Sequence, residues 1–184
     1  MSTLFERLRV DHVNMRDLLT VLAALVGRLH QDAADVDYQV MLDIFDYFTG
    51  FPDAVHHPVE DQLFDELLRR SPDLAAEIAE LRCEHEANAR DGAAIHRDLQ
   101  GICAGQLVSR QRLIEMTEAY IARQMVHMDK EEGRILPLAR ARIRDAEWDA
   151  FEERHKDAID PLFGPTIRET FKRLHDYVMD TTAS

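Results

Sequence analysis

The stretch His56-His57-Pro58-Val59-Glu60-Asp61 places a histidine and a glutamate, His56 and Glu60, four residues apart. The same spacing occurs a second time as His127 and Glu131. On an α-helix, residues four apart lie one turn apart and share a face, so each pair can direct an imidazole and a carboxylate at one metal centre. Two such pairs on facing helices predict a dinuclear metal site inside a helical bundle.

Apolar residues recur along the chain at the three- and four-residue spacing of amphipathic helices, and alternating β-branched runs are absent. Long helices are predicted over residues 4–30, 38–69, 72–100 and 109–142, and shorter ones over 147–156 and 166–179. Because short loops between long helices make antiparallel neighbours, we expect an all-α, up-down-up-down four-helix bundle. The bundle takes residues 1–142, and residues 143–184 form a C-terminal helical extension packed on it.

Composition limits the classes of function. The chain has 184 residues, enough for one domain with a sizeable core, and a formal net charge of −13. That charge argues against nucleic acids and anionic membrane surfaces as partners, because both attract Lys and Arg. No apolar run approaches a membrane span and the N-terminus lacks a signal-peptide pattern, so we expect a cytoplasmic protein. Cys83 and Cys103 are expected to be free, buried thiols.

The predicted loops allow a test of depth. Two residues on antiparallel helices lie at the same level when they are equidistant from the turn that joins the helices. The midpoints are position 34 for His12 and His56, between 70 and 71 for His56 and His85, and 106 for His85 and His127. Each midpoint falls on a predicted loop or helix start. We therefore expect one histidine from each of four helices at about the same level.

Unpartnered imidazoles and carboxylates inside a bundle would cost several kcal/mol in desolvation, which metal ions remove. The proline at position 58 predicts a local distortion of the helix that helps to aim the neighbouring ligands. His57 lies about 100° round the helix from His56, so it is either a further ligand or a surface residue.

Mixed imidazole and carboxylate ligands suit iron, manganese or zinc. The predicted metal ligands are His12, His56, Glu60, His85, His127 and Glu131, with His57 left open.

These motifs resemble the hemerythrin-like, HHE cation-binding family. The likeness runs from about residue 4 to residue 138, through His12, the segment from His56 to Phe64, Glu84-His85-Glu86, and the segment from His127 to Glu132 with Leu136-Pro137. The resemblance implies a four-helix bundle with an oxo- or hydroxo-bridged centre of two iron ions. It assigns His12 and His56 to one iron and His85 and His127 to the other. Glu60 and Glu131 are the implied bridges.

The chain also departs from the oxygen-carrying members of that family. A second histidine one turn after the first on the third helix is replaced by Ala89, and His57 is the candidate to supply the missing imidazole. The expected function is therefore a di-iron protein that binds or senses a small ligand such as O2, NO or peroxide. The alternatives are an enzyme that disproportionates peroxide, iron handling or iron–sulfur cluster repair, and a bundle held together by metal alone.

Overall fold

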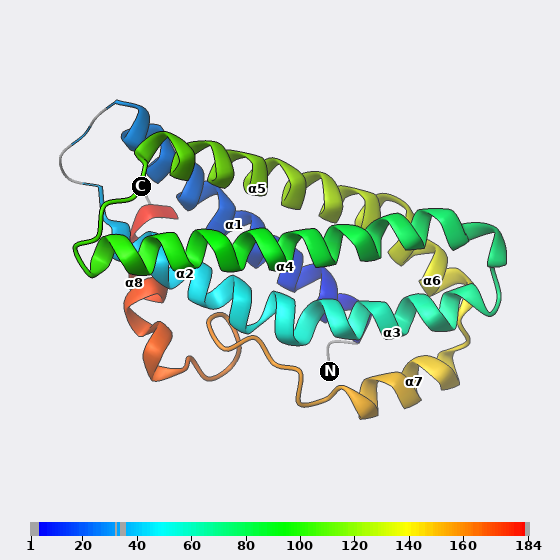
Figure 1. Ribbon diagram of the computed structural model, residues 1–184. Helices are drawn as coiled ribbons and strands as arrows, with labels where there is room; N and C mark the ends of the chain where they lie inside the picture. Colours follow the sequence, from blue (N-terminus) through cyan, green and yellow to red (C-terminus); the bar gives the residue numbers. More distant parts are fainter. Residues whose placement is uncertain (1–3, 32, 34–35, 183–184) are drawn as a thin grey trace.

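The computed structural model describes residues 4–31, 33 and 36–182, and the described part of the chain consists of helices and connecting loops without strands, as expected (Figure 1). No described helix is long and apolar enough to span a bilayer. The helices of the bundle region are α1 (Leu4–His30), α2 (Tyr38–Gly50), α3 (His57–Leu68), α4 (Ala75–Cys103), α5 (Arg110–Lys130) and α6 (Leu136–Arg142). The C-terminal region adds α7 (Asp145–Arg154) and α8 (Lys172–Thr182), and short 3₁₀ turns lie at Pro72–Leu74 and Glu169–Phe171.

Two of the predicted long helices are each divided by a wide, π-type turn. One turn spans Pro52–His56, between α2 and α3, and the other spans Glu131–Ile135, between α5 and α6. A proline follows each turn, Pro58 and Pro137, at the second position of the next helix. Because proline has no N–H and its ring crowds the preceding turn, a regular α-helix cannot run through these positions unchanged. Both wide turns carry or adjoin predicted metal ligands.

The helices of the bundle region lie side by side along one long axis (Figure 1). The row formed by α2 and α3 packs against α4, α4 packs against α5, and α5 packs against α1. Two apolar clusters fill the interior. One is centred on Phe45, Phe48 and Tyr120, and the other includes Leu8 and Phe64. On α1 and α4, the predicted ligands His12 and His85 fall in sequence between residues of the two clusters.

The C-terminal region packs on the outside of this arrangement and contributes to both clusters. Trp148 and Phe151 of α7 join the cluster of Leu8, and Leu174 of α8 joins the other cluster. The last helix begins later than the predicted residue 166. Residues 161–168 form a loop closed by the hydrogen bond from the Arg168 amide to the Pro161 carbonyl, so α8 cannot start before it.

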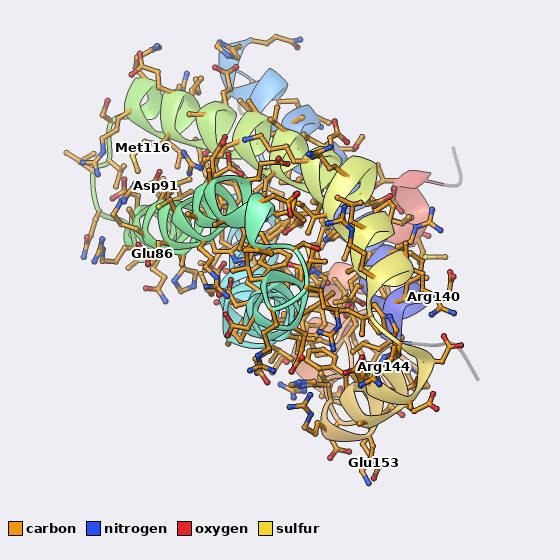
Figure 2. All side chains as sticks on the ribbon, turned by 90° about the vertical axis from the view of Figure 1, so that its right-hand side faces the viewer. Glu86, Asp91, Met116, Arg140, Arg144 and Glu153 are labelled. Atoms are coloured by element: carbon orange, nitrogen blue, oxygen red, sulfur yellow. The ribbon has the colours of Figure 1, made fainter. Side chains whose placement is uncertain are left out.

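The prediction of buried cysteines is wrong. Cys83 and Cys103 are both free and exposed. Cys83 lies two residues before His85 on α4, which is about 200° of helical rotation, so it points away from the interior that His85 faces. In Figure 2, the labelled side chains of Glu86, Arg140 and Glu153 lie on the outside of the molecule, and all three are exposed.

Candidate metal centre

Five histidines and two glutamates meet in the middle of the bundle region. His12 comes from α1, His85 from α4 and His127 from α5. His56 ends the first wide turn and His57 begins α3, so two consecutive residues face the same interior. All five imidazoles are buried, and the carboxylates of Glu60 and Glu131 have 0 % side-chain exposure.

One half of the centre is formed by His12, His56 and Glu60. The Nε2 atoms of His12 and His56 lie 3.1 Å apart, and each is 3.2 Å from Oε1 of Glu60. Potential ligand atoms of these three residues all lie within 4.8 Å of one another, so they could hold one metal ion. The spacing of His56 and Glu60 along the sequence therefore does bring their side chains together.

The other half is formed by His57, His85, His127 and Glu60, whose potential ligand atoms also lie within 4.8 Å of one another. The ring of His57 stacks on that of His85, with centroids 4.3 Å apart, and lies edge-on to His127 at 5.9 Å. His57 thus faces the centre and is not a surface residue. Three imidazoles surround this half, whereas two surround the half of His12.

The two glutamates span both halves. Glu60 directs Oε1 at His12 and His56, and its Oε2 lies 3.6 Å from Nε2 of His85. Glu131 directs Oε2 at His12 at 3.4 Å, and Oε1 at His85 and His127 at 3.5 Å and 3.2 Å. Each carboxylate therefore offers one oxygen to each half, which is the geometry required of a bridging ligand.

A second set of carboxylates contacts the outer nitrogen, Nδ1, of every imidazole. The Nδ1 partners are Glu132 for His12 (3.2 Å), Asp11 for His56 (3.0 Å), Asp53 for His57 (3.3 Å), Asp61 for His85 (3.3 Å) and Glu84 for His127 (2.9 Å). A carboxylate at Nδ1 fixes that nitrogen as the protonated one and leaves Nε2 as the electron-pair donor. In agreement with this, the Nε2 atoms of His12, His56, His85 and His127 all lie beside Glu60 or Glu131 in the interior.

The inward atoms lack the hydrogen bonds that buried polar atoms normally make. Both carboxylate oxygens of Glu60 and of Glu131, and Nε2 of His85 and of His127, have no hydrogen-bond partner. A buried polar group left unpaired costs about 1–3 kcal/mol, and a charged one more. Metal ions bound between these atoms would satisfy all of them, so the residues present fit a pair of metal ions.

The electrostatics of the metal-free centre agree with this. Burial alone would lower the pKa of His12, but Glu132 and Glu60 raise it to about 9. Burial would also lower the pKa of His85, but the hydrogen bonds to Asp61 and Glu131 raise it to about 10. Burial and the neighbouring Glu60 raise the pKa of Glu131, yet His127 and His85 lower it to about 2. Protons on imidazoles thus take the place of metal cations beside the carboxylates.

The structure brings together every residue that the sequence singles out as a ligand, including His57. Three outer carboxylates, those of Asp11, Asp53 and Glu84, are not among the residues predicted from the sequence. Asp53 is four residues before His57, so its spacing was a usable signal. Asp11 and Glu84 are adjacent to His12 and His85 but contact His56 and His127 on the facing helices, which spacing within one helix does not reveal.

The remaining histidines lie outside the centre. His30 pairs with Glu118 and His96 with Asp46, both at partly or fully exposed positions. His155 packs on the ring of Phe151, with centroids 4.5 Å apart. None of these histidines contributes to either half of the centre.

Fold and site together define a class of protein: an all-helical protein that holds a buried cluster of histidines and glutamates fit to bind metal cations. Comparison with known families matches residues 3–139 to the family described as "Hemerythrin HHE cation binding domain". The chain belongs to this hemerythrin family. Comparisons with curated proteins and with solved structures found no match.

Proposed function

We propose that the protein binds two iron ions and uses them to bind or sense a small ligand such as O2, NO or peroxide. The observation that carries the proposal is that Glu60 and Glu131 each offer one oxygen to the two-histidine half and one to the three-histidine half. Imidazole and carboxylate donors suit iron, with manganese or zinc as possible substitutes.

The protein's donors are distributed unequally in this proposal. His12 and His56 serve one iron, His57, His85 and His127 serve the other, and the two glutamates bridge them. The first iron therefore receives one imidazole fewer than the second. An exchangeable position for a small ligand is expected on that iron, because a site with fewer protein donors retains an open place.

When bound, the iron pair would supply electrons and a Lewis-acidic position for the ligand. The protein would supply the rest. The carboxylates at Nδ1 hold the imidazoles in place, and the apolar clusters on both sides exclude water from the centre. Glu84 and Asp61 increase the basicity of His127 and His85 through their hydrogen bonds.

The proposal extends to architecture and location. It takes the bundle region, residues 1–142, as an up-down-up-down four-helix bundle that holds the metals, and residues 143–184 as an extension packed on it. The end of the family match at residue 139 supports this division. The proposed location is the cytoplasm. The net charge of −13 supports a small molecule as the partner in place of nucleic acid or an anionic membrane surface.

Peroxide disproportionation is the second candidate function. It would use the same iron pair, and the open place on the two-histidine half would admit peroxide as well as O2. Oxygen evolution from peroxide that is lost in His127→Ala would favour this enzyme. Iron handling or cluster repair would instead require iron that leaves the folded protein readily.

Metal analysis followed by optical titration tests the proposal. Purified protein should contain about two iron ions per chain and should absorb in the near-ultraviolet when oxidised. The reduced protein should give a spectral response to O2 or NO. Protein that holds no iron, manganese or zinc, and that gains no thermal stability from added metal, would contradict metal binding. Bound metal with no response to NO or azide would leave only a structural role.

A further inference from the structure

The outer carboxylates of the centre differ in what lies behind them. Three of them are held by surface cations at Glu132–Arg16 (2.9 Å), Glu84–Lys130 (2.5 Å) and Asp61–Arg82 (3.4 Å). Asp11, the partner of His56, has no Lys or Arg within ion-pair distance among the described residues. Asp53, the partner of His57, likewise has no Lys or Arg within ion-pair distance among the described residues, so ion pairs close three sides of the centre and leave those of Asp11 and Asp53 without a cation.

A pocket of about 390 Å³ lies behind Asp11 instead. It is formed between residues 7–14 of α1 and residues 158–165 of the C-terminal region, and its lining is mostly apolar. Val10 and Ile159, which line it, are two of the few exposed large apolar residues, at 53 % and 48 % exposure. We call it the outer pocket. It opens to solvent at these two residues.

A second, smaller cavity shares lining residues with the outer pocket and has His56 of the centre in its wall. It has a volume of about 10 Å³, which is on the order of one water molecule, and we call it the inner cavity. Its walls include His56 together with apolar residues such as Phe51 and Val55. The two spaces share Arg7, Asp11 and Ala158, so these residues form the constriction between them.

The C-terminal segment is held firmly over this constriction. Arg7 donates to the backbone carbonyls of His155 at 2.9 Å and Lys156 at 3.3 Å. Oδ2 of buried Asp160 accepts hydrogen bonds from the Tyr47 hydroxyl at 2.8 Å and the Asn14 amide at 3.3 Å. Residues 158–165 lie beyond the family match, so this wall is a feature of the chain and not of the matched domain.

The geometry points to the outer pocket, the Ala158 constriction and the inner cavity as the route by which a small neutral molecule reaches the two-histidine half of the centre. The route rests on the proposed function, which places the exchangeable position at His12 and His56. Its lining determines the class of molecule. The mostly apolar lining suits an uncharged diatomic such as NO, and its charged groups have both signs, Arg7 beside Asp11 and Asp160, so the route has no single sign of charge that would attract an ion.

The other described surface pockets offer no comparable path. The pocket between α1 and α5, at Gly27 and Ala122, has a similar volume of about 340 Å³ but contains no residue of the centre. The pockets at Trp148 and at Lys130 likewise contain none of the metal-facing histidines or glutamates. Ala122 therefore provides a matched control position, because it is a pocket-lining alanine remote from the route.

The test is stopped-flow binding of NO to the iron(II)-loaded protein. Ala158→Trp fills the constriction and should slow association at least tenfold, with unchanged iron content and an unchanged final spectrum. Val10→Trp, at an exposed position on the rim, should slow it less and keeps the test available if Ala158→Trp does not fold. Ala122→Trp should bind NO at the wild-type rate.

The outcomes separate the route from the function. Wild-type rates in both Ala158→Trp and Val10→Trp would overturn the route and leave the proposed function intact. Equal slowing in Ala122→Trp would also overturn the route, because the effect would not be local. An iron-loaded wild-type protein that gives no optical response to NO would overturn both the proposed function and the route that rests on it.

Discussion

The imidazole rings of His57 and His85 stack with their planes 13° apart and their centroids 4.3 Å apart, although the two residues come from different helices. His56, the preceding residue, instead lies 3.1 Å from His12 through the two Nε2 atoms. Two consecutive histidines therefore belong to different halves of one centre. The wide turn that ends at His56 makes this possible, because the helix changes its winding between the two residues.

Replacing His57 tests its assignment to the three-histidine half. His57→Ala removes one imidazole from that half and should weaken binding of one of the two iron ions by at least about tenfold. Iron content after dialysis against a chelator measures the loss, and His96→Ala, at a surface ion pair, is the control. Full retention of both ions in His57→Ala would show that this imidazole is not a ligand.

The outer carboxylates should matter for metal affinity without contacting metal. Glu84→Gln weakens the hydrogen bond that orients His127, and a loss of about 10–100-fold in metal affinity is expected. Glu86→Gln changes the charge equally on an exposed side chain two residues away and should leave affinity unchanged. Competition with a coloured chelator measures the metal affinity of both variants. Equal losses of affinity would mean that Glu84 acts only through its negative charge and not through its hydrogen bond to His127.

Iron binding should release protons. In the metal-free centre the carboxylates around His12 and His85 hold the pKa values of these imidazoles at about 9 and 10, against the effect of burial. Both imidazoles are therefore protonated at pH 7.5 and must lose their protons to coordinate metal. Affinity should fall as the pH is lowered, by up to about a hundredfold per pH unit for two released protons.

Calorimetric titration in buffers of different ionisation enthalpy measures that proton release. A binding enthalpy that does not change with the buffer would contradict it. Glu86→Gln serves again as a control, because the side chain of Glu86 is exposed and its loss should not alter the number of protons released.

One buried hydroxyl, that of Tyr47, contributes to the attachment of the C-terminal region. Tyr47→Phe removes a hydrogen bond to Asp160, a carboxylate that is 6 % exposed, and should lower the free energy of unfolding by about 1–3 kcal/mol. Urea unfolding of the metal-free protein measures the change. Tyr177→Phe, on the half-buried face of α8, is the comparison, and a smaller loss is expected there. No loss in Tyr47→Phe would mean that Asp160 finds another donor.

Metal should also stabilise the folded protein by mass action. At a free iron concentration of a hundred times the dissociation constant, the free energy of unfolding should rise by about 2.7 kcal/mol. Thermal unfolding with and without iron measures the change, and His127→Ala should show a smaller rise. An equal rise in that variant would mean that the metal binds elsewhere on this acidic chain.

Part of this result follows from sequence alone. The apolar periodicity predicted the all-helical fold, and the start and end of α1 agree with the predicted range 4–30. The midpoint test anticipated that His12, His56, His85 and His127 would meet, because helical rise is uniform and loop positions fix the relative depth of antiparallel helices. The four-residue spacing likewise predicted that Glu60 and Glu131 would face the histidines of their own helices.

Other features depend on contacts that local spacing does not contain. The side to which His57 turns was open, because it depends on the winding of the turn at Pro52–His56. The single helix predicted over residues 109–142 is likewise interrupted by a wide turn before Pro137, because proline disturbs the winding of the turn that precedes it. Asp11 and Glu84 each support a histidine on another helix, which only packing between helices brings within reach.

The sequence by itself thus determined that the chain is helical, the level of the centre and six of its seven inward donors, since these follow from periodicity along helices and from the positions of the loops between them. The tertiary structure alone decided how those donors divide into a half with two imidazoles and a half with three. It also decided that residues 158–165 form a wall beside Asp11 and His56. The physical reason is that both features arise between segments distant in sequence, where packing and the winding of a wide turn set the direction of each side chain.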